Sequence, residues 1–164
     1  MFPKILVALI NGPAVGIAVS TLPLFDAVFA SSRATFAMPF IRTGQSAEGC
    51  SSWTFAQLMG SLRAKELLLF DRKLNADQAE QRGLVTRVID GERFEVETET
   101  ICQSIVALPH RSLLVNKSLM GQWSKSHLRQ VNDREVATLK EQWIGEDFGQ
   151  AIQDFLSRRT RSKL

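Results

Sequence analysis

Glu48 is the residue whose surroundings could support proton transfer. It stands among small residues in a polar loop, between an apolar segment at residues 35–40 and the expected start of a helix. Three apolar residues lie close by in sequence: Phe36, Phe40 and Trp53. A lone carboxylate among apolar groups is where a general base is expected. Glu48 could instead favour a helix N-terminus capped by Ser46, and the local sequence alone favours this second interpretation.

A second segment of interest lies near the start of the chain. Asn11-Gly12-Pro13 ends the apolar run of residues 4–10, and Gly16 follows three residues later. Asn-Gly and Gly-Pro are strong turn signals. Taken alone, the segment predicts a plain turn between a strand and a helix.

The composition is that of a globular protein. The 164 residues suffice for one domain or a large piece of one, with 45% hydrophobic and 23% charged residues. The net charge of +3 comes from a basic run at the C-terminus, which gives nucleic-acid binding little support. No apolar run reaches the length of a membrane span. Cys50 and Cys102 are too few for a disulfide framework and indicate thiols of a reducing compartment.

Hydrophobic periodicity predicts an α/β chain with strands in the first half and helices in the second. The expected strands span residues 4–10, 25–31, 35–40 and 84–89. The expected helices span residues 14–24, 49–59, 62–70, 75–83, 92–108, 112–124, 128–145 and 148–156. Asn75 is expected to cap the helix that Gly83 ends, and Gly60 is expected to end the helix over residues 49–59.

The first strand is the anomalous one. Residues 4–10 form a near-continuous apolar run, which is typical of a strand buried on both faces. The sequence supplies no obvious cover for it, so we expect either a missing N-terminal portion or cover from other chains.

The chain ends in Ser162-Lys163-Leu164, the address that the peroxisomal import receptor reads at an extreme C-terminus. A chance basic tail is the alternative. All three residues stand at the required position after a polar lead-in. We therefore expect the peroxisome matrix as the location and the import receptor as a partner.

Several separated motifs resemble those of the crotonase (enoyl-CoA hydratase/isomerase) superfamily. They read N-G-P-A-V-G-I-A from residue 11, F-D-A-V-F-A-S from residue 25, A-T-F-x-x-P-F from residue 34 and G-Q-S-A-E-G-C-S-S from residue 44. More narrowly, the chain is similar to the peroxisomal Δ3,Δ2-enoyl-CoA isomerases. The resemblance implies a spiral α/β core without its N-terminal strands, followed by a C-terminal helical region.

The resemblance also implies a division of the chain. Residues 1–91 would be the C-terminal part of the α/β core with the catalytic Glu. Residues 92–157 would be a helical oligomerisation or lid region, and residues 158–164 a basic tail with the targeting signal. We expect a homotrimer formed through the helices between residues 113 and 143, although ordinary core packing explains the same apolar pattern.

The family resemblance assigns roles to individual residues. Glu48 would be the base that moves a proton from C2 to C4 of a 3-enoyl-CoA, giving the 2-trans-enoyl-CoA of fatty-acid β-oxidation. The backbone N–H of Ile17 would stabilise the dienolate oxygen, and Gly12 and Gly16 would let the backbone approach the thioester. The neighbouring Phe36, Phe40 and Trp53 are candidates for the acyl pocket.

Two positions separate isomerisation from hydration. Hydratases of this superfamily use two acids, and the resemblance places them at Ser20 and Phe40. Neither side chain exchanges protons with water at neutral pH. A single carboxylate suits a 1,3-proton shift better than the addition of water.

The substrate class implied by the resemblance is fatty acyl-CoA, with no metal and no cofactor beyond the coenzyme A of the substrate itself. Three lysines could meet CoA phosphates, although solvated surface is the better interpretation: Lys117, Lys125 and Lys140. The alternative function is a catalytically inactive family member that binds acyl-CoA or joins oligomers.

The acidity of Glu48 depends on two opposing effects. Burial would raise its pKa, whereas a helix N-terminus would lower it. We expect desolvation to dominate. Among the other titratable residues, Asp26 is expected to bind backbone groups at its strand, and His110 and His127 to be exposed.

Overall fold

The computed structural model describes residues 2–161, apart from the side chains of residues 146 and 158–161. The strands are β1 Val7–Ile10, β2 Pro13–Val15, β3 Ala27–Ser31, β4 Thr35–Ala37, β5 Leu74–Asn75 and β6 Arg87–Ile89. Between them lie α1 Ile17–Ser20, η1 Leu22–Leu24, η2 Ile41–Thr43, α2 Ser51–Met59, α3 Ser61–Leu68 and α4 Ala76–Gln81. The helices α5 Phe94–Val106, α6 His110–Gly121, α7 Lys125–Ile144 and α8 Glu146–Arg161 follow.

The first four strands form two successive turns of a coil. β1 leads into β2 across the Asn11-Gly12 corner, and β3 leads into β4 across residues 32–34. The second turn lies beside the first, because β3 pairs in parallel with β1 and β4 pairs in parallel with β2. β6 and β5 complete two sheets with the orders β1-β3-β6 and β2-β4-β5. The ends of β2 and β4 therefore lie side by side.

The central strand β3 is apolar on both faces. Val28 and Ala30 point into the main core. Phe29 points the other way and meets Ile89 of β6 and Phe94 of α5. Because side chains alternate along a strand, one apolar run fills two layers.

The main core lies between the sheets and the helices α2, α3 and α4. Phe36, Phe55 and Leu67 are among its fully buried side chains, and burying each contributes about 1.5–3 kcal/mol. α4 begins with a capping box, in which Asn75 accepts from the N–H of Gln78 and the side chain of Gln78 accepts from the N–H of Asn75. The predicted cap is confirmed.

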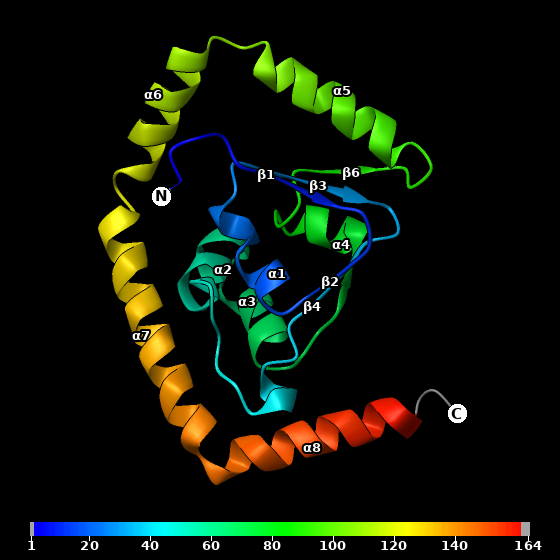
Figure 1. Cartoon of the computed structure of the whole chain (residues 1–164), viewed down its shortest axis with the longest axis vertical. Helices are drawn as coiled ribbons and strands as arrows, with labels where there is room; N and C mark the ends of the chain where they lie inside the picture. The colour runs from blue at the N-terminus through cyan, green and yellow to red at the C-terminus, as the bar shows by residue number, and fades with distance from the viewer. Residues whose placement is uncertain (1, 162–164) are drawn as a thin grey trace.

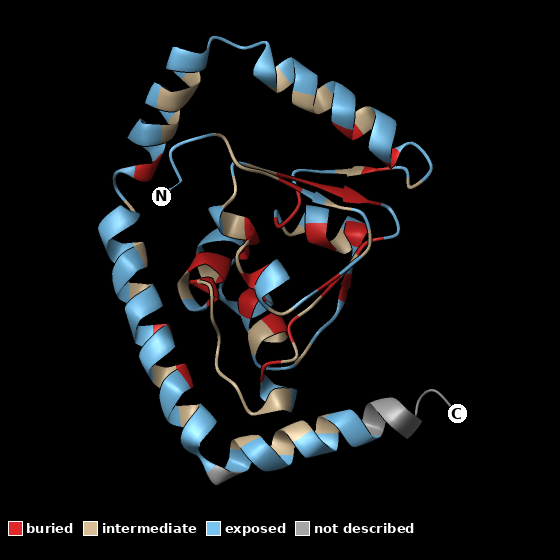
Figure 2. Ribbon diagram, in the orientation of Figure 1, coloured by how far each residue is buried: buried red, intermediate tan, exposed pale blue. Residues whose placement is uncertain are grey.

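The helices α5 to α8 run along the periphery of the α/β part (Figure 1). α5 contacts β3, α7 contacts α2, and α8 contacts η2. Buried residues concentrate in the sheets and in α2 to α4, whereas the peripheral helices are mostly exposed (Figure 2). Met120 is 81% exposed and Trp143 is 51% exposed. Core packing within this chain therefore does not explain these apolar residues, contrary to one expectation.

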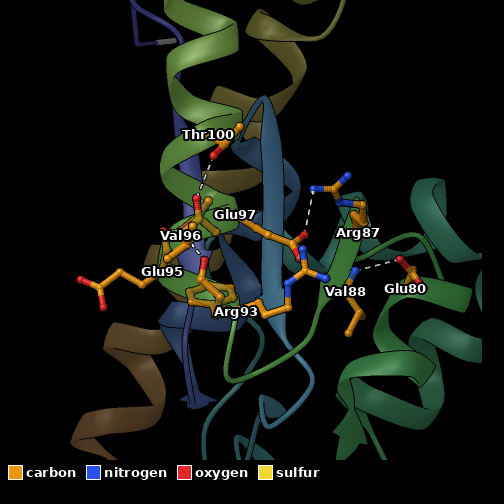
Figure 3. A network of polar contacts seen from close by, with 10 residues as sticks. Glu80, Arg87, Val88, Arg93, Glu95, Val96, Glu97 and Thr100 are labelled. Carbon is orange, nitrogen blue, oxygen red and sulfur yellow. Dashed lines mark hydrogen bonds and ion pairs between the residues drawn. The ribbon is translucent and has the colours of Figure 1, made fainter.

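Polar contacts join the start of α5 to β6 (Figure 3). Glu97 lies 3.1 Å from Arg93 and 3.9 Å from Arg87 of β6. In the same network, the N–H of Val88 donates to Oε1 of Glu80 at 2.8 Å. Both ion pairs are exposed to water, so each contributes about 0–1 kcal/mol. α5 is therefore held mainly by its apolar contacts with the sheet.

The predicted helix over residues 14–24 is wrong. Ala14 lies in β2 opposite Phe36 of β4, and a short helix begins only after Gly16. Gly16 has φ 63° and ψ −126°, which turns the chain from the strand into α1. Pro23 falls in η1 instead of bending a longer helix. Pairing with β4 overrides the helical pattern of these residues.

The first strand is shorter and less buried than expected. β1 begins at Val7, and Leu9 is 46% exposed. The expectation of burial on both faces is wrong, because β3 is the only partner of β1 among the described residues. The strands expected at residues 25–31, 35–40 and 84–89 are confirmed with shorter bounds as β3, β4 and β6.

Several helix ends follow the sequence signals. Gly60 and Gly83 have φ of 82° and 77°, and they follow α2 and α4 as predicted. α8 extends to Arg161, so the tail expected from residue 158 begins within a helix. Ser162-Lys163-Leu164 lies outside the described residues. None of the described helices combines the length and the apolar character needed to cross a membrane.

Candidate active site

Gly16 and Ile17 form the first part of the site. The N–H of Gly16 donates to the carbonyl of Ala37 at 2.9 Å, which extends the pairing of β2 with β4. Ile17 is the first residue of α1, and its N–H has no acceptor among the residues that the structure describes. An unpaired N–H at the start of a helix can donate to an oxygen that carries negative charge.

Glu48 lies in the loop that joins η2 to α2. The next two residues, Gly49 and Cys50, both have φ of 65° and turn the chain sharply into α2. A Cβ on Gly49 would lie 2.9 Å from Oγ of Ser20 and 3.2 Å from Cδ1 of Ile17. The loop therefore needs glycine directly after Glu48. This close approach brings the loop against the turn that carries Ile17.

Ile17 and Glu48 line the same pocket, which has a volume of about 340 Å³. Small-molecule sites typically have volumes of about 300–1,000 Å³. Its apolar wall consists of Leu24, Val136, Leu139 and Trp143. Its polar lining also includes Asn132, Glu135 and Lys140 of α7. The pocket thus lies between the α/β part and a peripheral helix.

Glu135 of α7 is a site residue that the sequence did not indicate. Its side chain is only 6% exposed. Oε2 accepts the N–H of Cys50 at 2.7 Å, and Oε1 accepts the N–H of Ser52 at 3.0 Å. These partners stand 85 and 83 residues away in sequence. An acid within a long polar helix carries no local signal of such a contact.

The site raises the pKa of Glu48. Burial raises the pKa of this carboxyl above its usual range, and the charge of Glu135 raises it further. The expectation that desolvation dominates is confirmed. Burial and Glu135 also raise the pKa of the Cys50 thiol, which keeps the thiol protonated at neutral pH.

The interpretation of Glu48 and Ser46 as helix-start residues is wrong. The N-cap residue of α2 is Cys50, and no acidic residue lies in the first turn of this fully described helix. The N–H of Ser46 donates instead to Oε1 of Gln142 at 2.7 Å. Glu135 supplies the negative charge at the N-terminus of α2.

The three predicted acyl-pocket residues lie away from this pocket. Phe36 and Phe40 are buried in the main core. Trp53 packs edge-on against the ring of His127, with the centroids 4.7 Å apart. None of the three lines the pocket of Ile17 and Glu48. Their placement gives the acyl-pocket prediction no support, because two of the rings are already packed and the nearby apolar wall comes largely from α7.

The glycines and the hydratase-acid positions named from the resemblance lie outside the lining of the pocket. Ser20 is fully buried beneath Gly49, and Phe40 is buried in the core. Gly12 stands at the corner between β1 and β2, where a Cβ would meet open space. Gly12 and Gly16 do not line the pocket themselves, so the contribution of Gly16 lies in turning the chain before Ile17.

Asp26 has the structural role predicted for it. Its carboxylate accepts the N–H of Leu6 at 2.7 Å and pairs with the ammonium of Lys117. The side chain of Lys117 is only 10% exposed, so it is not the solvated residue that we expected. His110 and His127 are exposed, as predicted.

The fold belongs to the class of crotonase-type enoyl-CoA hydratases and isomerases. The crystal structure of an enoyl-CoA hydratase/isomerase from Pseudoalteromonas atlantica T6c superimposes with a TM-score of 0.87 at 30% identity. The match covers 90% of this chain and 60% of that chain. The predicted crotonase-like fold is confirmed.

The family is shown by the sequence as well. A sequence model described as enoyl-CoA hydratase/isomerase matches residues 1–162, and the chain belongs to this family. Enoyl-CoA delta isomerase 2 of Rattus norvegicus is 48% identical over 98% of this chain and 41% of its own length. Enoyl-CoA delta isomerase 3, peroxisomal, of Mus musculus is 44% identical over 99% of this chain and 51% of its own length. The chain thus spans about half or less of the length of these curated relatives.

Proposed function

We propose that this chain carries the proton-transfer centre of a Δ3,Δ2-enoyl-CoA isomerase. The observation that supports this most is that Ile17 and Glu48 line one pocket. An unpaired backbone donor and a partly buried carboxylate are the two groups that a 1,3-proton shift next to a thioester requires. Relatives named enoyl-CoA delta isomerase support the same substrate class.

The reaction starts with the thioester oxygen near the N–H of Ile17 and with C2 of a 3-enoyl-CoA near Glu48. The carboxylate removes a proton from C2, and the electrons of that C–H bond move into a dienolate. The negative charge gathers on the thioester oxygen, where one preorganised donor contributes about 3–4 kcal/mol. Glu48 then returns the proton to C4, which leaves the double bond between C2 and C3.

The raised pKa of Glu48 suits both halves of this cycle. A carboxyl with its usual pKa would be a weak base and would hold the transferred proton poorly. Burial and the charge of Glu135 make the carboxylate a stronger base. The same carboxyl can then deliver its proton to C4.

Hydration is disfavoured because the pocket presents one carboxylate at the reacting position. By the family resemblance, Ser20 and Phe40 stand where a hydratase would have its two acids, and both side chains are buried. Glu135 also lines the pocket, but both of its oxygens already accept backbone N–H groups. Glu135 therefore has a structural role at the N-terminus of α2, and Glu48 is the carboxylate of the pocket without a hydrogen bond to the backbone among the described residues.

The location and the partners follow from sequence features and from a relative. We propose import into the peroxisome matrix by the receptor that reads Ser162-Lys163-Leu164. A relative that is named peroxisomal supports this location. We also propose a homotrimer, a fatty acyl-CoA substrate, and no cofactor beyond the coenzyme A that the substrate carries.

Product identification tests the proposal. The purified protein is incubated with a 3-enoyl-CoA, and the acyl-CoA products are separated and identified. We expect 2-trans-enoyl-CoA to accumulate without 3-hydroxyacyl-CoA. Accumulation of the hydroxy product, with the 2-enoyl product only transient, would contradict the proposal and indicate a hydratase.

A non-catalytic oligomer partner or acyl-CoA binder is the second candidate. The exposed apolar residues of α6 and α7 favour it, since Met120 and Trp143 would find cover in an assembly. Sedimentation analysis combined with the same assay separates the two functions. A soluble trimer that binds acyl-CoA without turnover would favour this second candidate.

A further inference from the structure

α7 contacts the Glu48 loop on both sides of the catalytic carboxylate. Two residues before Glu48, the N–H of Ser46 donates to Oε1 of Gln142 at 2.7 Å. Two residues after it, the N–H of Cys50 donates to Oε2 of Glu135 at 2.7 Å. The loop is thus fixed to one helix at two points that bracket Glu48.

The two anchoring residues share one face of α7. Glu135 and Gln142 are seven residues apart, which corresponds to about two helical turns and places them in line. Glu135 is the stronger anchor, because it is buried and accepts the N–H of Ser52 as well as that of Cys50. Hydrogen bonds to a charged acceptor are roughly twice as strong as neutral ones.

The backbone between these anchors has an unusual conformation. Gly49 and Cys50 are both left-handed, and a non-glycine residue such as Cys50 adopts this conformation only at a cost. The bond from the N–H of Cys50 to Glu135 holds the residue in this conformation. Glu48 stands two residues before Cys50, so we expect the direction of its side chain to depend on the same bond.

We infer that Glu135 and Gln142 are positioning residues, which hold the Glu48 loop against α1 and so aim the base at the substrate. This inference rests on the proposed function and extends it to a helix outside the α/β part. Glu135 in addition places a fixed negative charge beside Glu48. The other groups that line the same pocket and can carry charge are Lys140 of α7 and Cys50 of the loop itself.

Two variants test the inference, each against a matched control on the same helix. Glu135→Gln keeps the shape of the side chain but removes its charge and one acceptor. Gln142→Leu removes the acceptor of the Ser46 N–H. Glu141→Gln changes an exposed neighbouring acid, for which the described residues show no hydrogen bond or ion pair with the loop, and serves as the control.

Two readouts separate positioning from simple structural support. The first is the titration of the Glu48 carboxyl, followed by NMR of 13C-labelled glutamate. Glu135→Gln should move its midpoint to lower pH, because a charge that raises the pKa is removed. The second is turnover of a 3-enoyl-CoA. We expect kcat to fall up to about 10²-fold while KM changes little, because a displacement of about 1 Å can cost that much in rate.

The outcomes distinguish the two proposals. If the unaltered protein does not isomerise 3-enoyl-CoA, the proposed function fails, and faster amide exchange at Ser46 and Cys50 in the two variants still tests whether α7 holds the Glu48 loop. If Glu135→Gln leaves both the titration and kcat at the values of Glu141→Gln, the positioning role is wrong. If Glu135→Gln does not fold, Gln142→Leu tests the positioning role instead. This variant should show faster amide exchange at Ser46 and a lower kcat than the control, and the values of the control would contradict the inference.

Discussion

The α/β part of the chain and the peripheral helices differ sharply in how their apolar residues are covered (Figure 2). Phe55 of α2 is 0% exposed, whereas Met120 of α6 is 81% exposed. Packing therefore fixes the geometry of the α/β part. The peripheral helices are held by fewer contacts, such as the bonds from α7 to the Glu48 loop.

The pocket lies where these two regions meet. The α/β part supplies Ile17 and Glu48, and α7 supplies Glu135. The proposed reacting groups therefore lie in the well-packed α/β part. The charge that helps to raise the pKa of Glu48 comes from α7, which belongs to the more exposed region. The site thus depends on contacts that local sequence patterns do not reveal.

The largest expected loss of stability follows from a substitution in the core of the α/β part. Phe55→Ala should lower the free energy of unfolding by about 3–5 kcal/mol, because it leaves a cavity in a packed interior. Met120→Ala should change the free energy of unfolding of the monomer by no more than about 0.5 kcal/mol, because this side chain is exposed in the single chain. Urea denaturation of both variants measures the difference. Equal losses of unfolding free energy would contradict the difference in burial between the α/β part and the peripheral helices.

A smaller effect is expected at the contact between the Glu48 loop and α1. Gly49→Ala should cost about 1–3 kcal/mol, because φ is 65° and a Cβ would lie 2.9 Å from Ser20. The matched control is Gly149→Ala in α8, where a Cβ meets nothing within 4 Å. This control should be neutral or should stabilise the helix by up to about 1 kcal/mol. If the free energy of unfolding of Gly49→Ala equals that of the control, the loop does not pack closely against α1.

The smallest effect concerns the pH dependence of stability. The pKa of Glu48 is raised in the folded state, so its ionisation opposes folding. The stability associated with this carboxyl is present below its unfolded pKa and is lost as pH rises through its folded pKa. The difference in unfolding free energy between the wild type and Glu48→Gln should therefore fall as pH rises from about 4 to 8. Denaturation at a series of pH values measures it, and a flat difference would contradict burial of the carboxyl.

Sequence patterns predict the fold class and most of its elements. The largely apolar run from Phe25 to Ser31 corresponds to β3, and the cap signal at Asn75 and the helix-ending Gly83 correspond to α4. The patterns fail where pairing between distant segments decides the structure. β2 looks helical in the sequence, and it becomes a strand because β4 lies beside it.

The residues of the candidate site also differ in how far the sequence predicts them. Glu48 and Ile17 follow from motifs, because the residue types and their order resemble a known family. Glu135 and Gln142 could not be predicted, since their partners lie more than 80 residues away in sequence. The acyl-pocket prediction for Phe36 and Phe40 gains no support from their burial in the core, because closeness in sequence does not show which way a ring points in a strand or turn.

The rate of Glu48→Gln tests the central claim most directly. The variant keeps the size of the side chain but removes the base, and Glu141→Gln on the exposed side of α7 is the control. We predict that isomerisation of 3-enoyl-CoA falls by at least about 10²–10⁴-fold, the range for loss of a general base, while acyl-CoA binding is unchanged. Isomerisation by Glu48→Gln at the rate of the control would contradict the account.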